Sequence, residues 1–336
     1  MTEQERLQWD ELPHQLTDWA ETQLGARIIN ADSQKGGFSR GAALRVVGEN
    51  GQRAFLKAVD AAVYGQTARL YLAEARHLQL LPVNVPVAHH LATFTECNWV
   101  GLLLADIEGR HPDFAADTED LVKVFHAFDE VSAIDASHFD IEQLRPSLEG
   151  EVRLWSKISE LLSNNSITDA SYSHVKSSAV RRQLLRYVTQ LEISAHRYAE
   201  YVDGFLIPNL DGEQIVHTDV RADNILVTDT QAVIVDWAWM CRGNAAVDSA
   251  LIVVDAVCAG TSLSVPDMVR QSRLLSAQPP HFVDALIVSM AGFYLYAALQ
   301  EGEVGTTSNL PLVRAQRAVA LLDWVDLHRE EIGLAV

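Results

Sequence analysis

Residues 214–237 read QIVHTDVRADNILVTDTQAVIVDW, and in them His217-Thr-Asp219-Val-Arg221-Ala-Asp-Asn224 is followed twelve residues later by Asp236. The β-branched clusters around this segment predict short strands. A carboxylate and an amide five residues apart on a tight loop, with a second carboxylate ending the next hairpin, can converge on one phosphate and its metal ion. Asp219 would accept or orient the proton of an acceptor hydroxyl, while Asn224 and Asp236 would hold Mg²⁺ through oxygen.

Upstream of this segment, residues 26–105 have the composition of strands and turns around one helix. The turn at 48–52 (GENGQ) between AALRVV and RAFLKAV is a hairpin signal. Residues 66–81 carry a helical apolar stripe that ends before Pro82. With RIINADSQ before them and PVAHHLATF and WVGLLLA after them, these runs predict a small sheet packed with one helix.

Downstream of about residue 112, the apolar residues recur at the three-to-four spacing of helices. The predicted helices cover residues 117–134, 148–163, 180–202, 285–300 and 312–331. A β-rich first third and a helical remainder predict an α+β, two-lobed fold. We expect an N-terminal nucleotide-binding lobe at 1–106 and a catalytic and substrate-binding lobe at 107–336, joined near residues 107–113.

The segment HTDVRADN, together with VIVDW, resembles the catalytic loop H-x-D-x-x-x-x-N and the downstream metal-binding Asp-Trp of the aminoglycoside phosphotransferase and kinase-like small-molecule kinase family. The alternative is that His217, Asp219 and Asn224 only cap a turn. Protein kinases share the loop in more distant form, but the chain has no D-F-G or A-P-E segment. The resemblance implies a protein-kinase-like fold, ATP or GTP as co-substrate, and Mg²⁺.

The family also needs a lysine in the N-terminal sheet, held by a glutamate on the following helix, to grip the α- and β-phosphates. Lys57 in RAFLKAV and Glu74 in YLAEARHLQLL occur in the expected order. A lysine inside an apolar strand costs free energy unless its charge is paired or used. The alternative is a solvated lysine and a solvated glutamate.

Two further segments are expected to contact the nucleotide. Gly36 to Gly41 lies where the family's phosphate-covering turn belongs, which makes Gly37, Phe38 and Ser39 candidates, because glycine lets backbone N–H groups approach phosphate oxygens. The stretch from Leu102 to Gly109 resembles the family's hinge. By that resemblance, the carbonyl of Ala105 and the N–H of Ile107 would contact the base.

Three residues are expected to support the catalytic loop. Arg221 stands two residues after Asp219, where many kinases place a cation that neutralises charge on the transferring phosphoryl group. The alternative for Arg221 is a salt bridge with Asp223 or another acid. His217 is expected to support the loop through hydrogen bonds. Asp248 matches a family aspartate near a helix start, and we expect it to brace the loop.

Composition restricts the partners and the compartment. The 336-residue chain has a formal net charge of −19, which disfavours nucleic acid and anionic membrane and favours a cationic ligand. Three cysteines without a CxxC spacing indicate neither a disulfide framework nor a zinc site. The N-terminus does not have the pattern of a secretory signal, and the apolar run at 285–299 is shorter than a membrane span. We therefore expect a cytoplasmic protein, with that run as a buried core helix.

The function expected from these features is Mg²⁺-dependent transfer of a nucleotide γ-phosphate to a hydroxyl of a small molecule, with aminoglycoside-type antibiotics as a named possibility. The alternatives are a kinase of a primary metabolite such as an amino alcohol or a sugar, and a catalytically silent nucleotide-binding pseudokinase. We expect a monomer or a homodimer. The sequence does not specify which acceptor is phosphorylated, whether the nucleotide is ATP or GTP, or whether the protein confers antibiotic resistance.

Overall fold

The computed structural model describes residues 6–34, 41–300 and 309–334. The chain forms two compact units, one made of Met1–Pro112 with Ala222–Met240 and the other of Asp113–Arg221 with Cys241–Val336. The predicted lobes at 1–106 and 107–336 stay a prediction. The compact units differ from them because residues 222–240 pack with the N-terminal part of the chain.

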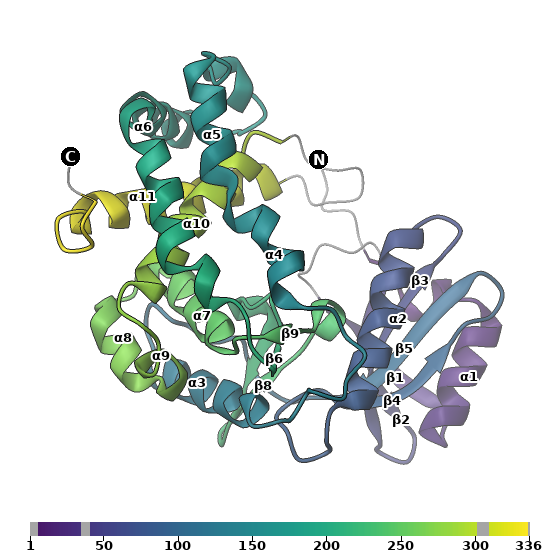
Figure 1. Cartoon of the computed structure of the whole chain (residues 1–336). Helices are drawn as coiled ribbons and strands as arrows, with labels where there is room; N and C mark the ends of the chain where they lie inside the picture. Colours follow the sequence, from purple (N-terminus) through teal and green to yellow (C-terminus); the bar gives the residue numbers. More distant parts are fainter. Residues whose placement is uncertain (1–5, 35–40, 301–308, 335–336) are drawn as a thin grey trace. The chain divides into compact units, whose positions relative to one another are not determined.

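The first unit contains a five-stranded antiparallel sheet in the order β1-β2-β3-β5-β4 (Figure 1). Its strands are β1 (Ile28–Ser33), β2 (Ala42–Gly48), β3 (Arg53–Asp60), β4 (His90–Phe94) and β5 (Trp99–Ala105). All five were predicted from strand-like runs of sequence. In the centre of the sheet, Lys57 of β3 pairs with Ala43 of β2 and with Leu102 of β5.

Helices cover both faces of this sheet. Helix α1 (His14–Leu24) buries Leu16 in a core with Leu44 and Leu56. Helix α2 (Gly65–Leu80) packs Tyr71 near Val59, which points to the opposite face from Leu56 because side chains alternate along a strand. Helix α2 confirms the predicted helix, whereas α1 is not among the predicted elements.

A hairpin from later in the chain completes the first unit. It consists of β7 (Ile225–Val227) and β8 (Ala232–Ile234), followed by the 3₁₀ turn η5 (Trp237–Trp239). The N–H of Ile234 donates to the carbonyl of Pro86 at 2.8 Å, and Arg110 and Val227 exchange backbone hydrogen bonds of 3.0 and 2.7 Å. These bonds tie residues 222–240 to the N-terminal part of the chain.

The second unit is mostly helical. Its helices are α3 (Thr118–Ser132), α4 (Leu144–Val152), α5 (Leu154–Ser163), α6 (Ser178–Phe205), α7 (Ala246–Ala259), α8 (Val265–Gln271), α9 (Arg273–Ser276), α10 (Phe282–Ala297) and α11 (Leu310–His328). Strands β6 (Gln214–Val216) and β9 (Cys241–Gly243) form a separate two-stranded sheet. Most of α10 is buried, as expected for a core helix. No described helix is long and apolar enough to cross a bilayer.

The single helix predicted at 148–163 is wrong. The chain forms α4 and α5 instead, because Arg153 has φ −92° and ψ 16° and interrupts the helical geometry between them. The apolar spacing continues through this one-residue break, so periodicity does not reveal it. The α+β fold class itself is confirmed by the sheet and the helical unit.

Candidate functional site

Lys57, Glu74 and Asp236 come together in the first unit. The ammonium nitrogen of Lys57 lies 2.9 and 2.6 Å from the two carboxylate oxygens of Glu74 and 3.1 Å from Oδ1 of Asp236. The Glu74 side chain is 0% exposed and that of Lys57 is 13% exposed, whereas the Asp236 side chain is 45% exposed. The cation is therefore anchored on its buried side by Glu74 and has an accessible carboxylate on the other.

The two carboxylates stabilise the positive charge of Lys57. Burial alone would lower the pKa of Lys57, but the carboxylates of Asp236 and Glu74 outweigh burial and raise it. Burial raises the pKa of Glu74, against the opposing attraction of Lys57. Removing the lysine would leave a buried carboxylate without its cation, which costs more than the pair itself contributes.

The β7–β8 hairpin brings Asn224 and Asp236 to the same end. Asn224 directly precedes β7, Asp236 is the second residue after β8, and the N–H of Val235 donates to the carbonyl of Asn224 at 3.0 Å. The next residue, Asp236, has a left-handed backbone with φ 69° and ψ 56°. Such a conformation is uncommon outside glycine and is found where the surroundings fix it.

The surroundings of Asp236 are fixed by Trp237, which follows it. The indole of Trp237 is 0% exposed and donates to the carbonyl of Ile234 at 3.0 Å. Nδ1 of His77 on α2 donates to the carbonyl of Trp237 at 2.8 Å. The Asp-Trp pair is thus a carboxylate attached to an anchored turn, and Trp237 acts through packing.

The donor atoms at this end of the hairpin fit Mg²⁺. The amide of Asn224 and the carboxylate of Asp236 offer oxygen ligands, and Mg²⁺ needs only one or two protein groups when phosphates and water supply the rest. The Asp236 carboxylate is accessible to a metal ion, and the positive charge of its partner Lys57 would attract the phosphates that accompany the metal.

Asp219 and Arg221 lie in the second unit. Nε of Arg221 lies 3.8 Å from Oδ1 of Asp219, and the two side chains are 23% and 37% exposed. Arg221 thus lies within ion-pair distance of the predicted base, which is one of the acids that the alternative interpretation of Arg221 allows. The accessible carboxylate of Asp219 leaves room for an acceptor hydroxyl.

Asp248 braces the loop before Asp219, as expected. Its carboxylate accepts hydrogen bonds from the N–H of His217 at 2.7 Å and from the N–H of Thr218 at 3.0 Å. Thr218 has φ 70°, a strained value for a β-branched residue, and the two bonds hold it there. His217 is fully buried, in keeping with a supporting role. Burial raises the pKa of Asp248 to about 7, although both backbone hydrogen bonds oppose the increase.

The predicted hinge begins within β5, whose last residue is Ala105. The N–H of Ala105 donates to the carbonyl of His89 at 2.8 Å, so the group that Ala105 can offer to a base is its carbonyl. Asp106 is held by two arginines, which the sequence analysis did not identify. The candidates Gly37, Phe38 and Ser39 lie outside the described residues.

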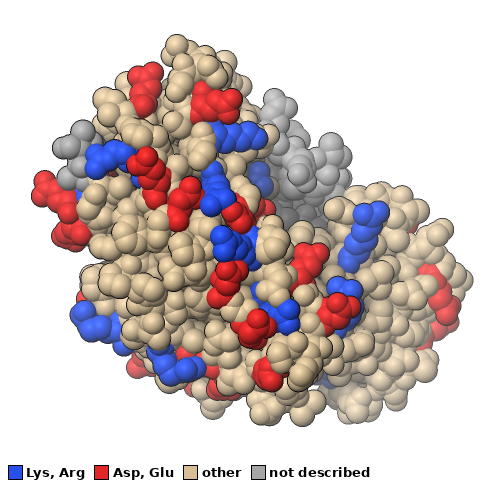
Figure 2. Space-filling model, viewed as in Figure 1, with Lys and Arg blue, Asp and Glu red and all other residues tan. Residues whose placement is uncertain are grey.

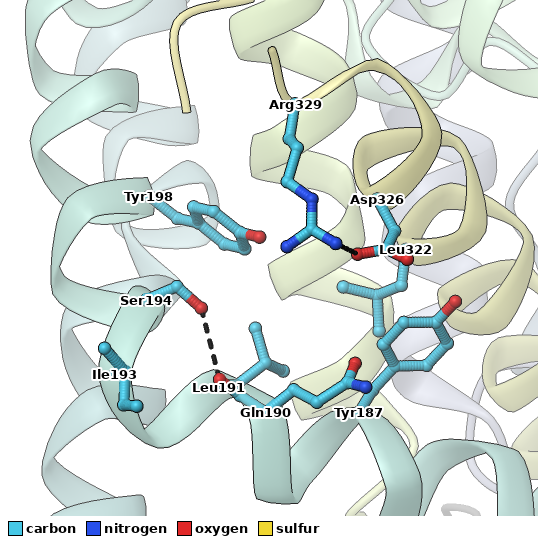
Figure 3. A pocket seen from close by; sticks show the side chains of 9 residues that line it. All are labelled: Tyr187, Gln190, Leu191, Ile193, Ser194, Tyr198, Leu322, Asp326 and Arg329. Atoms are coloured by element: carbon cyan, nitrogen blue, oxygen red, sulfur yellow. Dashed lines mark hydrogen bonds and ion pairs between the residues drawn. The ribbon is translucent and has the colours of Figure 1, made fainter. Parts of the chain in front are cut away.

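A pocket of about 200 Å³ lies in the second unit between α6 and the C-terminal end of α11 (Figure 3). Tyr187 and Tyr198 line it on α6, and the Arg329 guanidinium bonded to Asp326 lies on the opposite wall. No predicted site residue lines this pocket. On the face drawn in Figure 2, acidic and basic side chains are interspersed.

Comparisons with known proteins bear on the family and the fold of the chain. Residues 35–280 match the model of the phosphotransferase enzyme family. The structure is similar to that of an aminoglycoside phosphotransferase from Alicyclobacillus acidocaldarius subsp. acidocaldarius, with a TM-score of 0.58 and 12% identity over 96% of this chain and 97% of that one. It is also similar to the aminoglycoside phosphotransferase APH(4)-Ia in a ternary complex with AMP-PNP and hygromycin B. That match has a TM-score of 0.53 and 14% identity over 93% of this chain and 98% of the other.

No curated protein matches the sequence. The structural similarity confirms the predicted protein-kinase-like fold, with a β-rich N-terminal part and a larger helical part.

Proposed function

The chain belongs to the phosphotransferase enzyme family, and from this premise we propose that it transfers the γ-phosphate of ATP or GTP to a hydroxyl of a small molecule. The observation that carries the proposal is the position of Lys57, whose ammonium group lies within 3.1 Å of both Glu74 and Asp236. A lysine fixed by a buried glutamate and facing an accessible carboxylate is the arrangement that kinases use to grip phosphates beside a metal ion.

In this proposal each residue of the first unit has a separate task. Glu74 holds Lys57 so that its charge meets the α- and β-phosphates with little loss of side-chain entropy. Asn224 and Asp236 hold Mg²⁺, which when bound supplies positive charge to the phosphate oxygens. Ala105 and Ile107 bind the base, and Gly37, Phe38 and Ser39 cover the phosphates.

Asp219 and Arg221 act on the acceptor and on the transferring group. Asp219 accepts a hydrogen bond from the acceptor hydroxyl and takes its proton as the new P–O bond forms and the bond to the β-phosphate oxygen breaks. Arg221 neutralises charge on the transferring group, a role that its position beside Asp219 supports. Asp248 keeps the loop in the conformation that presents Asp219.

The acceptor is proposed to be a hydroxylated small molecule. The APH(4)-Ia complex with hygromycin B supports an aminoglycoside-type acceptor, and a net charge of −19 favours a cationic one. A primary metabolite such as an amino alcohol or a sugar is the second candidate, since one fold serves many acceptors. A pseudokinase is disfavoured because Lys57, Glu74 and Asp236 are in place.

A nucleotide-consumption screen tests the proposal. The protein is incubated with Mg²⁺ and ATP or GTP against aminoglycosides, other antibiotics and common hydroxylated metabolites, with Asp219→Asn as the inactive control. Turnover that depends on one acceptor and is lost in the variant supports the proposal. Failure to bind either nucleotide would refute it, whereas binding without turnover for any acceptor would favour the pseudokinase.

A further inference from the structure

Asp106, the first residue after β5, is held by a pair of arginines from neighbouring strands. Nε and Nη2 of Arg45 on β2 donate to its two carboxylate oxygens at 2.7 and 3.0 Å, and Nε of Arg53 on β3 donates to Oδ2 at 2.8 Å. The Asp106 side chain is 3% exposed. Three charge-assisted bonds, two of them in a bidentate fork, fix the start of the hinge.

The two arginines differ in what else they contact. Nη2 of Arg45 also donates to the backbone carbonyl of Ile107 at 3.2 Å. Arg53 instead pairs with the exposed side chain of Glu108 at 2.6 Å. Arg45 therefore occupies a hinge carbonyl, whereas Arg53 supports the same carboxylate without contacting the hinge backbone.

This carbonyl matters because of the hydrogen-bonding groups of purine bases. Adenine carries an amino donor at C6 beside a ring acceptor, whereas guanine carries an acceptor oxygen at C6 beside ring and amino donors. The carbonyl of Ala105 followed by the N–H of Ile107 matches adenine. Guanine would instead need the N–H of Ile107 for its C6 oxygen and the carbonyl of Ile107 for its ring and amino donors.

In this structure, guanine would have to share the Ile107 carbonyl with a guanidinium. The oxygen has a second lone pair, but a donor approaching it would also meet the positive charge of Arg45. Arg45 donates hydrogen bonds to Asp106 that raise the pKa of its guanidinium, a group that is always charged in proteins.

The clamp lies on the sheet face that carries Lys57. Arg53, Phe55 and Lys57 alternate along β3 onto one face, and Arg45 pairs with Phe55 across the strands. Lys57 lies four positions after Arg53, which is about 13 Å along the strand. The base-reading segment and the phosphate-gripping lysine are thus placed along one face.

We propose that Arg45, fixed by Asp106, makes the hinge select nucleotides whose purine carries a 6-amino group, so that the protein uses ATP in preference to GTP. This inference rests on the proposed function and names its nucleotide. Arg45 is a positioning residue, since it acts through the Ile107 carbonyl.

Calorimetric titration with ADP and GDP in the presence of Mg²⁺ tests the inference without an identified acceptor. The unaltered protein is expected to bind ADP about 10- to 100-fold more tightly than GDP, as one unmade hydrogen bond predicts. Arg45→Met should bring this ratio close to one. Arg53→Met is the matched control. It should weaken the binding of ADP and GDP to a similar extent and so keep the ratio of the two affinities.

Equal binding of ADP and GDP by the unaltered protein would overturn the inference while leaving the proposed function intact. A preference that persists in Arg45→Met would overturn the assignment to Arg45. Binding of neither nucleotide would refute the proposed function and the inference with it. Thermal unfolding checks each variant, and if Arg45→Met does not fold, Arg45→Gln, which also removes the charge, replaces it with the same expected loss of preference.

Discussion

The ammonium nitrogen of Lys57 lies 2.6 Å from a carboxylate oxygen of Glu74, and both groups are nearly inaccessible to solvent. A buried ion pair is weak evidence for stability, because desolvation offsets much of the attraction. Here the pair has a third member, Asp236, whose carboxylate is accessible. This arrangement is the one that the proposed function requires, with Lys57 and Asp236 facing the phosphates and the metal ion.

Lys57→Met should lower kcat/KM by about 100-fold or more, because one charged contact to the phosphates contributes roughly that much. The measurement is nucleotide turnover with the identified acceptor, together with ADP affinity. Lys176→Met, at an exposed position of the second unit, is the control. Wild-type kinetics in Lys57→Met would contradict a role in phosphate binding.

Asp236→Asn should raise the Mg²⁺ concentration needed for half-maximal ADP binding by about 10- to 100-fold, because a neutral amide is a poorer ligand for a hard cation. Mg²⁺ titrations at fixed ADP measure the effect. Asp229→Asn, an exposed residue in the turn of the same hairpin, controls for the loss of one negative charge. Equal Mg²⁺ requirements in the two variants would exclude Asp236 as a ligand.

Asp248 should make stability depend on pH. Burial raises its pKa to about 7 from 3.8, so the native protein holds a proton that the unfolded chain releases between these values. The contribution of Asp248 to the free energy of unfolding is therefore largest below about pH 4 and declines as the pH rises to about 7.

Denaturant unfolding at several pH values tests this expectation. The free energy of unfolding of the wild type, taken relative to that of Asp248→Asn, should fall between about pH 4 and about pH 8. A difference that stays constant or grows with pH would show that the carboxyl is ionised throughout and is stabilised by its two backbone donors.

Gly292 should resist substitution in the helical core. An alanine Cβ there would lie 2.7 Å from Nε1 of Trp155, whose indole is fully buried and donates to the carbonyl of Val288. Gly292→Ala is therefore expected to destabilise the protein by about 1–3 kcal/mol.

Gly150 on α4 is the matched control for Gly292. No atom would lie within 4 Å of an alanine Cβ at this position, so Gly150→Ala should stabilise the helix by about 0.5–1 kcal/mol. Denaturant midpoints compare the two variants. Equal effects of the two substitutions would contradict the close packing of α10 on Trp155.

The sequence predicts those parts of the molecule that local pattern determines. The strands of the N-terminal sheet follow from β-branched runs and turn residues. The pairing of Lys57 with Glu74 is expected from the resemblance to the family, and the cost of burying an unpaired charge supports it. The site roles of Asp219, Asn224 and Asp236 stay predictions that rest on spacing and resemblance.

Features that depend on distant partners escape local pattern. The strand-like run at Gln214 forms a sheet with Cys241–Gly243, because hydrogen bonding between remote segments decides its partner. The clamp on Asp106 joins residues 61 and 53 positions away. The signal that could have suggested the clamp is an aspartate directly after the strand that leads into the predicted hinge, together with one arginine on each of two earlier strands.

Transfer of label from ATP radiolabelled at the γ-phosphate to an acceptor is the most direct test of phosphotransferase activity. Wild-type protein with Mg²⁺ should place the label on a hydroxyl of one small molecule, and Asp219→Asn should not, while both bind ADP alike. Label that stays in ATP or appears only as inorganic phosphate for every acceptor tested would contradict the proposed transfer.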